Sequence, residues 1–468
     1  MPEVDLASAD GCTSAPASVC HNHGYYAIGG PRPDNLDSFL HHFARNGYRT
    51  AAYGKVHVPD NPTNWFAEGI DEWADTLNGP DGTKATAPYR EYLREVGCDG
   101  IEDHDVIREI GNHPHHWDAR PSKVPLEHCV EAWINRKATD FIGALGEDES
   151  FCIHCSYPHP HHCLTPDKRF WDAIPEDVEP PQLWAENAGR PPNFRKMADY
   201  GREGLEWHFE PKTIQAGAKR VWRATLALIL QNDHFFGELF DFLKAKGRWD
   251  DTIIVFHDDH GAYHGIYGVM EKAPGICSDA VCRVPSVWKV PGNTPGVRQQ
   301  LIEHVDLAPT LCSACGLPPM DAVDGIDLSA VLRDPEAPTK KVAVSEWPWS
   351  KAIRWDKWRL VHYHRDMYDG EDVGELYDME VDPWEQNNLY ADPDHQDIVN
   401  EGLRLLLEWL TDTTRITTMW PYLPEDMPAF RCQEPFDLGC DGKEKRGKGP
   451  RARLEKGNIG AFAVGDYL

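Results

Sequence analysis

An unbroken apolar run that leads directly into acidic and imidazole side chains constrains this chain more than any other feature. Residues 253–256 (IIVF) are typical of a strand buried on both faces, and residues 257–260 (HDDH) follow directly. In open α/β sheets, ligands bind where parallel strands end. Carboxylate oxygens and a neutral imidazole can hold a divalent cation, which makes Asp259 and His260 candidate metal ligands. The alternative is a solvated acidic loop after a strand.

A lysine and a histidine lie two positions apart in a second short segment. Residues 47–57 read GYRTAAYGKVH, so Lys55 and His57 would project from one face of an extended chain. An ammonium group beside an imidazole suits an oxyanion. Taken alone, an edge strand with two surface side chains would be the simpler interpretation.

The composition is that of a large chain without a membrane segment. Its 468 residues can bury a sizeable core, and no apolar run approaches the roughly 20 residues that span a bilayer. The formal net charge of −29 argues against nucleic acid, and any positive field for an anionic substrate must therefore be local. The 13 cysteines follow no regular framework, which favours reduced thiols and a cytoplasmic location. Cys312 and Cys315 form a CxxC that lacks the second pair of a zinc ribbon.

Helical periodicity alternates with short strands over residues 1–330. Apolar residues recur at helical spacing over 36–46 and 225–246, and each helix leads into one of the two strands above. A further strand at 151–157 (FCIHCSY) ends in a histidine-rich loop. Helix followed by strand is the repeat of a doubly wound α/β sheet with helices on both faces, in which the three strand ends would converge.

The pattern changes after about residue 330. Short strands rich in tryptophan, such as residues 352–364 (AIRWDKWRLVHYH), alternate as antiparallel strands with one solvated face do. Residues 398–411 predict a helix that closes a small C-terminal α+β subdomain, which we place at 331–425. The charged stretch within 426–468 predicts a flexible tail without a function of its own.

Three motifs together resemble the sulfatases of the alkaline phosphatase superfamily. They are GYRTAAYGKVH at 47–57, FHDDHG at 256–261 and RVPSVWKVPG at 283–292. Further segments match family landmarks in the same order: SYPHPHHCLTPDKRF at 156–170, HVDLAPTL at 304–311, SEW at 345–347 and ELYDMEVDPWEQNNL at 375–389. The resemblance covers most of the chain. It implies an alkaline phosphatase-like α/β fold and hydrolysis of a small-molecule sulfate ester.

The resemblance also implies roles for individual side chains. Lys55 and Lys272 would bind the sulfate oxygens, and His57 would serve the nucleophile. His159, in the proline- and histidine-rich segment, would contact the leaving-group oxygen. Lys272 would otherwise be a surface lysine after a glycine turn.

A metal site is implied by the same resemblance. Asp259 and His260 would hold the ion, with Ca²⁺ as the first expectation. Because an imidazole in place of a second oxygen donor softens the site, Mn²⁺ is also plausible. Tyr267 occupies a position where many relatives have a histidine.

Two parts of the family pattern are absent from the sequence. Family members carry an amino-terminal strand that ends in two metal-binding aspartates, followed by a CxPSR or SxPSR motif whose Cys or Ser becomes formylglycine, the nucleophile. Residues 18–20 resemble the approach to that motif, yet HNHG at 21–24 follows directly. Cys20 is therefore a candidate nucleophile by position only, and Cys12 is a weaker one.

Three functions stay open at this point. The favoured one is a sulfuric ester hydrolase. The second is a phosphate or phosphonate ester hydrolase of the same superfamily, because the same groups accept tetrahedral phosphorus. The third is a noncatalytic anion-binding relative. The alcohol half of the ester is not specified, since residues 97–125, with several histidines, would either line a pocket or form a polar insertion.

Overall fold

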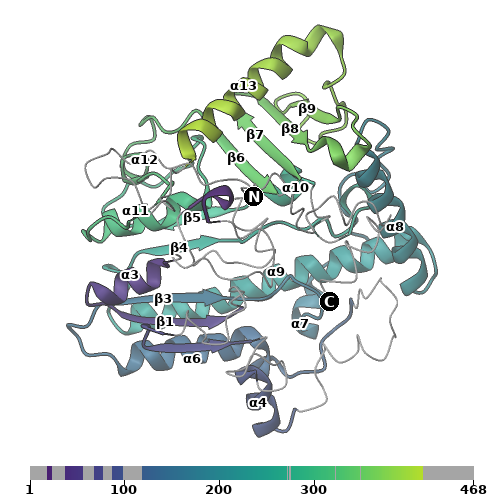
Figure 1. Ribbon diagram of the computed structural model, residues 1–468. Coiled ribbons are helices and arrows are strands. Elements are labelled where there is room, and N and C mark those ends of the chain that lie inside the picture. Colours follow the sequence, from purple (N-terminus) through teal and green to yellow (C-terminus); the bar gives the residue numbers. More distant parts are fainter. Residues whose placement is uncertain are drawn as a thin grey trace, which may run out of the picture.

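The computed structural model describes most of the chain, and Figure 1 shows how its helices and strands are arranged. The described residues are 18–23, 37–55, 68–76, 87–98, 119–270, 272, 276–321, 323–347 and 349–414. The predictions for Cys12, for His57 and for a tail at 426–468 lie outside these residues. None of the described helices combines the length and the apolar character needed to cross a membrane.

A parallel three-stranded sheet carries the first of the predicted site residues (Figure 1). Its strand order is β2–β1–β3, with β1 at Arg49–Gly54, β2 at Glu72–Asp75 and β3 at Phe151–Ser156. Gly54 lies opposite Ser156, and the backbone N–H of Lys55 donates to the carbonyl of Ser156 at 3.0 Å. The two strands therefore end together, and Lys55 lies beside the loop that leads to His159.

Helices cover both faces of this sheet (Figure 1). Helix α3, Phe39–Arg45, packs on the face that carries Ala52, whereas α6, Val130–Ala144, packs on the face that carries Ala51 and Tyr53. Side chains alternate along a strand, so successive residues of β1 reach opposite layers. The doubly wound α/β arrangement predicted from the sequence is confirmed.

The longest of the described helices, α9, spans Ile214–Ala245 and begins well before the predicted start at residue 225. Thr213 caps its first turn by accepting a hydrogen bond from the backbone N–H of Ala216. A glycine in a helix is disfavoured by propensity, but Gly217 is required where α8, Pro192–His208, crosses. A Cβ atom at Gly217 would lie 2.1 Å from the carbonyl oxygen of Leu205 in α8.

Apart from the C-terminal helix, the other described helices are short and lie in the connections between the strands and the longer helices. The α-helices are α2 at Cys20–His23, α4 at Pro88–Glu95, α7 at Lys168–Ala173, α10 at Asp279–Cys282, α11 at Leu307–Ala314 and α12 at Ser329–Arg333. The 3₁₀ turns are η4 at Leu126–His128, η5 at Ile266–Gly268, η6 at His304–Asp306, η7 at Arg365–Tyr368 and η8 at Pro393–His395.

The strand that leads into Asp259 differs from the expectation. It is β4, Ile254–His257, and it pairs antiparallel with β5, Ser286–Lys289. All four of its residues are partly exposed, and within the described ranges β4 has no second ladder. The predicted parallel pairing and full burial were therefore wrong within the described residues, because the partner of β4 there is antiparallel and its side chains are partly exposed. An apolar run indicates a strand but does not specify which partner it pairs with.

The C-terminal sheet is antiparallel, as predicted. Its order is β6–β7–β8–β9, with β6 at Val342–Trp347, β7 at Ser350–Trp355, β8 at Trp358–Tyr363 and β9 at Gly374–Asp378. Helix α13, Gln396–Thr413, covers one face through Val399 and Leu406 (Figure 1). The other face is not solvated, because Val361 and Tyr363 pack in one core with Phe194 of α8. The alternation marked the strands correctly but misjudged the second face. The boundary at residue 330 stays a prediction.

A buried ion cluster links this sheet to the rest of the chain. Arg190 precedes α8 and donates to Glu375 at 2.9 Å and to Glu385 at 2.8 Å. Arg359 of β8 lies 3.0 Å from the same Glu385. All four side chains are at most 3% exposed. The two positive groups offset the two carboxylates where water is excluded.

Candidate active site

Lys55 and Asp259 meet where β1 and β4 end. The Nζ atom of Lys55 lies 3.3 Å from Oδ2 of Asp259, with the two side chains 7% and 25% exposed. The other carboxylate oxygen, Oδ1, accepts the backbone N–H of His260 at 2.9 Å. The structure thus brings together three residues that the sequence predicts from segments about 200 positions apart.

The imidazole of His260 is oriented by its own loop. Its Nδ1 atom lies 2.9 Å from the carbonyl oxygen of Gly261, an atom that can only accept, so Nδ1 carries the proton. The unprotonated nitrogen is then Nε2, which lies 3.5 Å from Oδ2 of Asp259. An Nε2 lone pair and a carboxylate oxygen at this separation form a pair that one cation can bridge, and the outer hydrogen bond sets the ring orientation.

Three further histidines lie near this pair and were not predicted as site residues. His154 is in β3, His257 ends β4, and His304 begins η6, with the rings of His257 and His304 5.1 Å apart. Burial, and then the neighbouring His257, lower the pKa of His154 to about 4. Burial also lowers the pKa values of His257 and His304. In all three imidazoles, burial therefore favours the neutral form.

The first aspartate of the HDDH segment behaves differently from the second. Asp258 is exposed as a residue, but partial loss of solvent around its carboxyl group and the nearby charge of Asp259 raise its pKa to about 6. Asp259, by contrast, is partly buried and pairs with Lys55. Only the tertiary environment separates these two neighbouring residues.

His159 follows β3 on a loop tied to two helices. Its Nδ1 atom lies 2.5 Å from Oε1 of Glu131 in α6, and its carbonyl accepts from Asn232 Nδ2 of α9 at 2.8 Å. Glu131 is fully buried and also accepts from Gln231 at 2.9 Å. Burial opposes the charge of Glu131, but the charge and hydrogen bond of His159 outweigh it and lower the pKa of the carboxyl.

Two further predicted site residues, Cys20 and Lys272, lie in short described segments of the chain. Cys20 opens the four-residue helix α2 and is 0% exposed. Its neighbour His21 lies 3.0 Å from Glu346 of β6, and Asn22 donates to Asp324 at 3.0 Å, so α2 is anchored to later parts of the chain. Lys272 is partly buried in a loop where residues 271 and 273–275 lie outside the described part.

The donor set for a metal is incomplete. Among the described residues, no group of three His, Cys, Asp or Glu side chains is arranged to hold an ion. Asp259 and His260 supply two convergent donors. Two donors fit a cation whose remaining positions are filled by other oxygens, but they do not enclose it.

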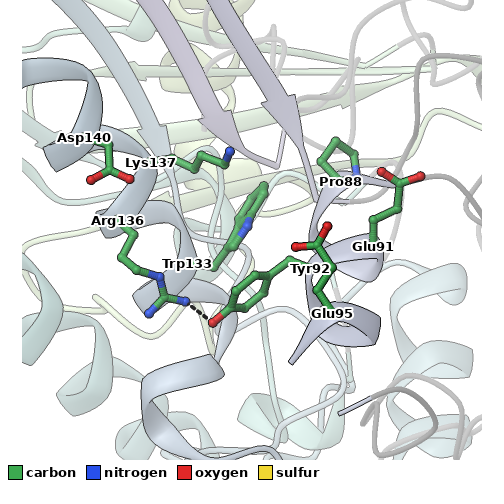
Figure 2. A pocket seen from close by; sticks show the side chains of 8 residues that line it. All are labelled: Pro88, Glu91, Tyr92, Glu95, Trp133, Arg136, Lys137 and Asp140. Carbon is green, nitrogen blue, oxygen red and sulfur yellow. Dashed lines mark hydrogen bonds between the residues drawn. The ribbon is translucent and has the colours of Figure 1, made fainter. Parts of the chain in front are cut away.

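A separate cavity of about 350 Å³ lies between α4 and α6 (Figure 2). It is lined by Pro88, Glu91, Tyr92, Glu95, Trp133, Arg136, Lys137 and Asp140. Figure 2 shows Arg136 donating to the Tyr92 hydroxyl, at 2.5 Å. No predicted site residue is among these eight, so we do not assign the ester chemistry to this cavity.

Comparison of the sequence with models of known protein families shows which family the chain belongs to. The family model described as "Sulfatase" matches residues 10–317. This chain belongs to the sulfatase family. A second model, described as "N-sulphoglucosamine sulphohydrolase, C-terminal", matches residues 267–412, which include the antiparallel sheet and all but the last residue of α13.

Curated relatives of this sulfatase-family chain carry several different names. It is 28% identical over 376 residues to a choline-sulfatase of Rhizobium meliloti, covering 77% of this chain and 68% of the relative. It is 24% identical to an arylsulfatase of Clostridium perfringens, covering 79% and 76%. It is also 25% identical to a multifunctional alkaline phosphatase superfamily protein of Trinickia caryophylli, covering 81% and 80%.

Solved structures show the same fold. A phosphonate monoester hydrolase of Silicibacter pomeroyi matches with a TM-score of 0.69 at 19% identity, over 88% of both chains. A protein solved with its substrate D-glucosamine-2-N,6-O-disulfate matches with a TM-score of 0.65 at 19% identity, also over 88% of both chains. The alkaline phosphatase-like fold predicted from the motifs is confirmed.

Proposed function

We propose that this sulfatase-family chain hydrolyses a small sulfate monoester at the junction of β1, β3 and β4. The observation that carries the proposal is the 3.3 Å approach of Lys55 to Asp259. It places a buried ammonium group next to a carboxylate–imidazole pair in a protein of net charge −29. A local positive group in a strongly acidic protein suits an anionic substrate.

Side-chain roles follow from charge and position. Lys55, joined by Lys272, binds the equatorial sulfate oxygens, on which charge develops during in-line attack. His159 protonates the departing alcohol oxygen as the S–O bond breaks. His57 assists the nucleophile. The buried thiol of Cys20 enters as the candidate nucleophile because the formylglycine motif is absent from the sequence.

Asp259 and His260 would hold a divalent cation, Ca²⁺ or Mn²⁺. The sulfatase family is generally metal-dependent. The proton on Nδ1 of His260 and the 3.5 Å separation of its Nε2 from Asp259 support this pair. When bound, the cation would supply Lewis-acid stabilisation of negative oxygen. Water or substrate oxygens would complete its coordination.

A second candidate function is hydrolysis of phosphonate or phosphate esters. The fold match to a phosphonate monoester hydrolase, over 88% of both chains, favours it. Matched 4-nitrophenyl esters of sulfate, phosphate and phenylphosphonate separate the two functions. A kcat/KM higher for the phosphonate ester would replace the sulfate assignment.

The decisive experiment measures 4-nitrophenyl sulfate hydrolysis by the purified chain, with Ca²⁺ or Mn²⁺ supplied. The Lys55→Ala His57→Ala double variant is run beside it. We expect turnover in the wild type and its loss in the double variant. Sulfate binding without turnover that survives Cys20→Ala would identify a noncatalytic anion-binding protein instead.

The partner proposed is a small molecule, and the location proposed is the cytoplasm. The described cysteines form no disulfide with one another, which supports a reducing compartment. Subcellular fractionation of the host cells, with antibody detection of this chain in each fraction, would test the location.

A further inference from the structure

A buried carboxylate outside the predicted catalytic set lies against His159. Glu131 belongs to the first turn of α6, and its Oε1 atom lies 2.5 Å from Nδ1 of His159. Its second oxygen accepts from Nε2 of Gln231 at 2.9 Å. Gln231 in turn accepts from the backbone N–H of Asp167 at 2.8 Å. Both oxygens of the carboxylate therefore have fixed partners.

Glu131 lies on the face of α6 opposite the cavity between α4 and α6. Glu131 and Asn135 are four positions apart and face α9, where Asn135 donates to the carbonyl of Phe235 at 2.7 Å. Trp133 and Arg136 lie on the other side of the helix and line the cavity, as Figure 2 shows. Glu131 therefore has no part in that cavity, and its neighbours come from α9 and the His159 loop.

The charge of Glu131 requires an explanation. An ionised carboxylate without solvent costs several kcal/mol unless a partner offsets it. His159 is that partner, because its charge and hydrogen bond keep the pKa of Glu131 below the usual value against burial. Among the described residues, Cys129 and Tyr157 also feel the charge of Glu131, and burial raises the pKa of each, so both stay neutral. An uncharged glutamine would fill the same volume without this cost.

We propose that Glu131 is a positioning residue for proton transfer by His159. The carboxylate accepts the Nδ1 proton, fixes the ring, and leaves Nε2 to face the departing oxygen. It also favours the imidazolium form that can donate. When the S–O bond breaks, its electron pair stays on the alcohol oxygen, which takes the Nε2 proton. The Nδ1 proton stays on the ring and remains hydrogen-bonded to the Glu131 carboxylate. The proposal rests on the role assigned to His159 above.

The first test reads His159 directly and needs no turnover. Chains with ¹⁵N-labelled histidine are titrated by NMR, and the His159 signals are assigned by their loss in His159→Gln. In Glu131→Gln, we expect the pKa of His159 to fall by roughly one to three and its Nδ1-protonated tautomer to lose preference. An unchanged pKa and tautomer in a folded variant would overturn the proposal.

The second test uses leaving groups of different basicity. Protonation matters for a poor leaving group such as an alkyl alcohol and little for 4-nitrophenolate. Glu131→Gln should therefore lower kcat for an alkyl sulfate by roughly ten- to a hundredfold, with KM and 4-nitrophenyl sulfate turnover changed much less. An equal loss on both esters would indicate a structural role only.

Two further variants keep the tests interpretable. Glu375→Gln neutralises another buried carboxylate, held by Arg190, and should leave the leaving-group dependence and the His159 titration as in the wild type. If Glu131→Gln does not fold, Glu131→Asp is used instead. Its shorter side chain keeps the charge but holds it farther from His159, so the pKa of His159 should fall below the wild-type value by a smaller amount. A wild type that hydrolyses no sulfate ester refutes the proposed function, while the NMR titration still decides the role of Glu131.

Discussion

Arg190 and Glu385 form an ion pair at 2.8 Å although 195 positions separate them in the sequence. The pair joins the segment before α8 to the loop after β9, and Arg359 lies against the same carboxylate. Burial alone would raise the pKa of Glu385, but Arg359 and Arg190 outweigh it and lower the pKa to about 2. The stability of the chain should therefore depend on this carboxylate in acid.

The first prediction concerns acid stability. A carboxyl group more acidic in the folded than in the unfolded chain stabilises the fold above its unfolded pKa, near 4.5. That contribution is lost as the pH falls toward about 2. Glu385→Gln should lower the free energy of unfolding at pH 7 by roughly 3–5 kcal/mol and flatten its decline between these pH values. Urea unfolding at stepped pH measures both.

The matched control for the acid experiment is Glu380→Gln. Glu380 is exposed at the end of the same sheet. This variant should keep the wild-type slope of stability against pH. A wild-type slope in Glu385→Gln as well would show that the ion cluster does not set the acid response.

The second prediction uses two glycines of the same helix. A Cβ atom at Gly217 would overlap the carbonyl oxygen of Leu205 at 2.1 Å, whereas one at Gly237 would meet nothing within 4 Å. Gly217→Ala should therefore reduce the free energy of unfolding by roughly 1–3 kcal/mol. Gly237→Ala should raise it by about 0.5–1 kcal/mol through helix propensity. Thermal unfolding of both variants provides the comparison, and equal effects would contradict the close α8–α9 packing.

The third prediction concerns anion binding by Lys55. Lys55→Met keeps the apolar stem and removes the charge, so sulfate binding should weaken roughly ten- to a hundredfold. Lys357→Met removes a lysine that pairs with Asp378 in the C-terminal sheet and should bind sulfate as the wild type does. Calorimetric titration with sulfate measures both. Equal affinities in the two variants would remove Lys55 from the anion site.

The fourth prediction concerns the metal. A cation that binds only the folded chain stabilises it by about 2.7 kcal/mol at a hundredfold excess over its Kd. Mn²⁺ or Ca²⁺ should therefore raise the Tm of the wild type, and a chelator should reverse the rise. Asp259→Asn should abolish the effect, whereas Asp251→Asn, at an exposed position before β4, should retain it. A metal-dependent Tm in Asp259→Asn would place the ion elsewhere.

Several strands and the positions of candidate site residues could be predicted because their patterns are local, while the roles of those residues stay predictions. The apolar run before His257 and the alternation in 352–364 mark strands correctly, and the motif residues identify Lys55, Asp259 and His260. Pairing was predicted less well. The antiparallel partner of β4 and the core behind the C-terminal sheet both depend on segments distant in the sequence.

One helix shows how a local pattern misleads. The apolar period of 225–246 would place Ile229 inward with Leu243, and Leu243 is 4% exposed whereas Ile229 is 50% exposed. The helix also extends back to Ile214, because a cap at Thr213 and packing against α8 outweigh the low helix propensity of Gly217. Local propensity does not reveal which turns of a long helix are covered.

The sequence by itself determined the local elements, the family and the side chains able to bind an anion or a cation, because these depend on residue type, spacing and order. Only the tertiary structure decided which charges meet. It placed Lys55 against Asp259, made Glu131 the partner of His159, and gave the adjacent Asp258 and Asp259 different environments. Burial and the approach of distant segments set these relationships, and neither can be read from the order of residues.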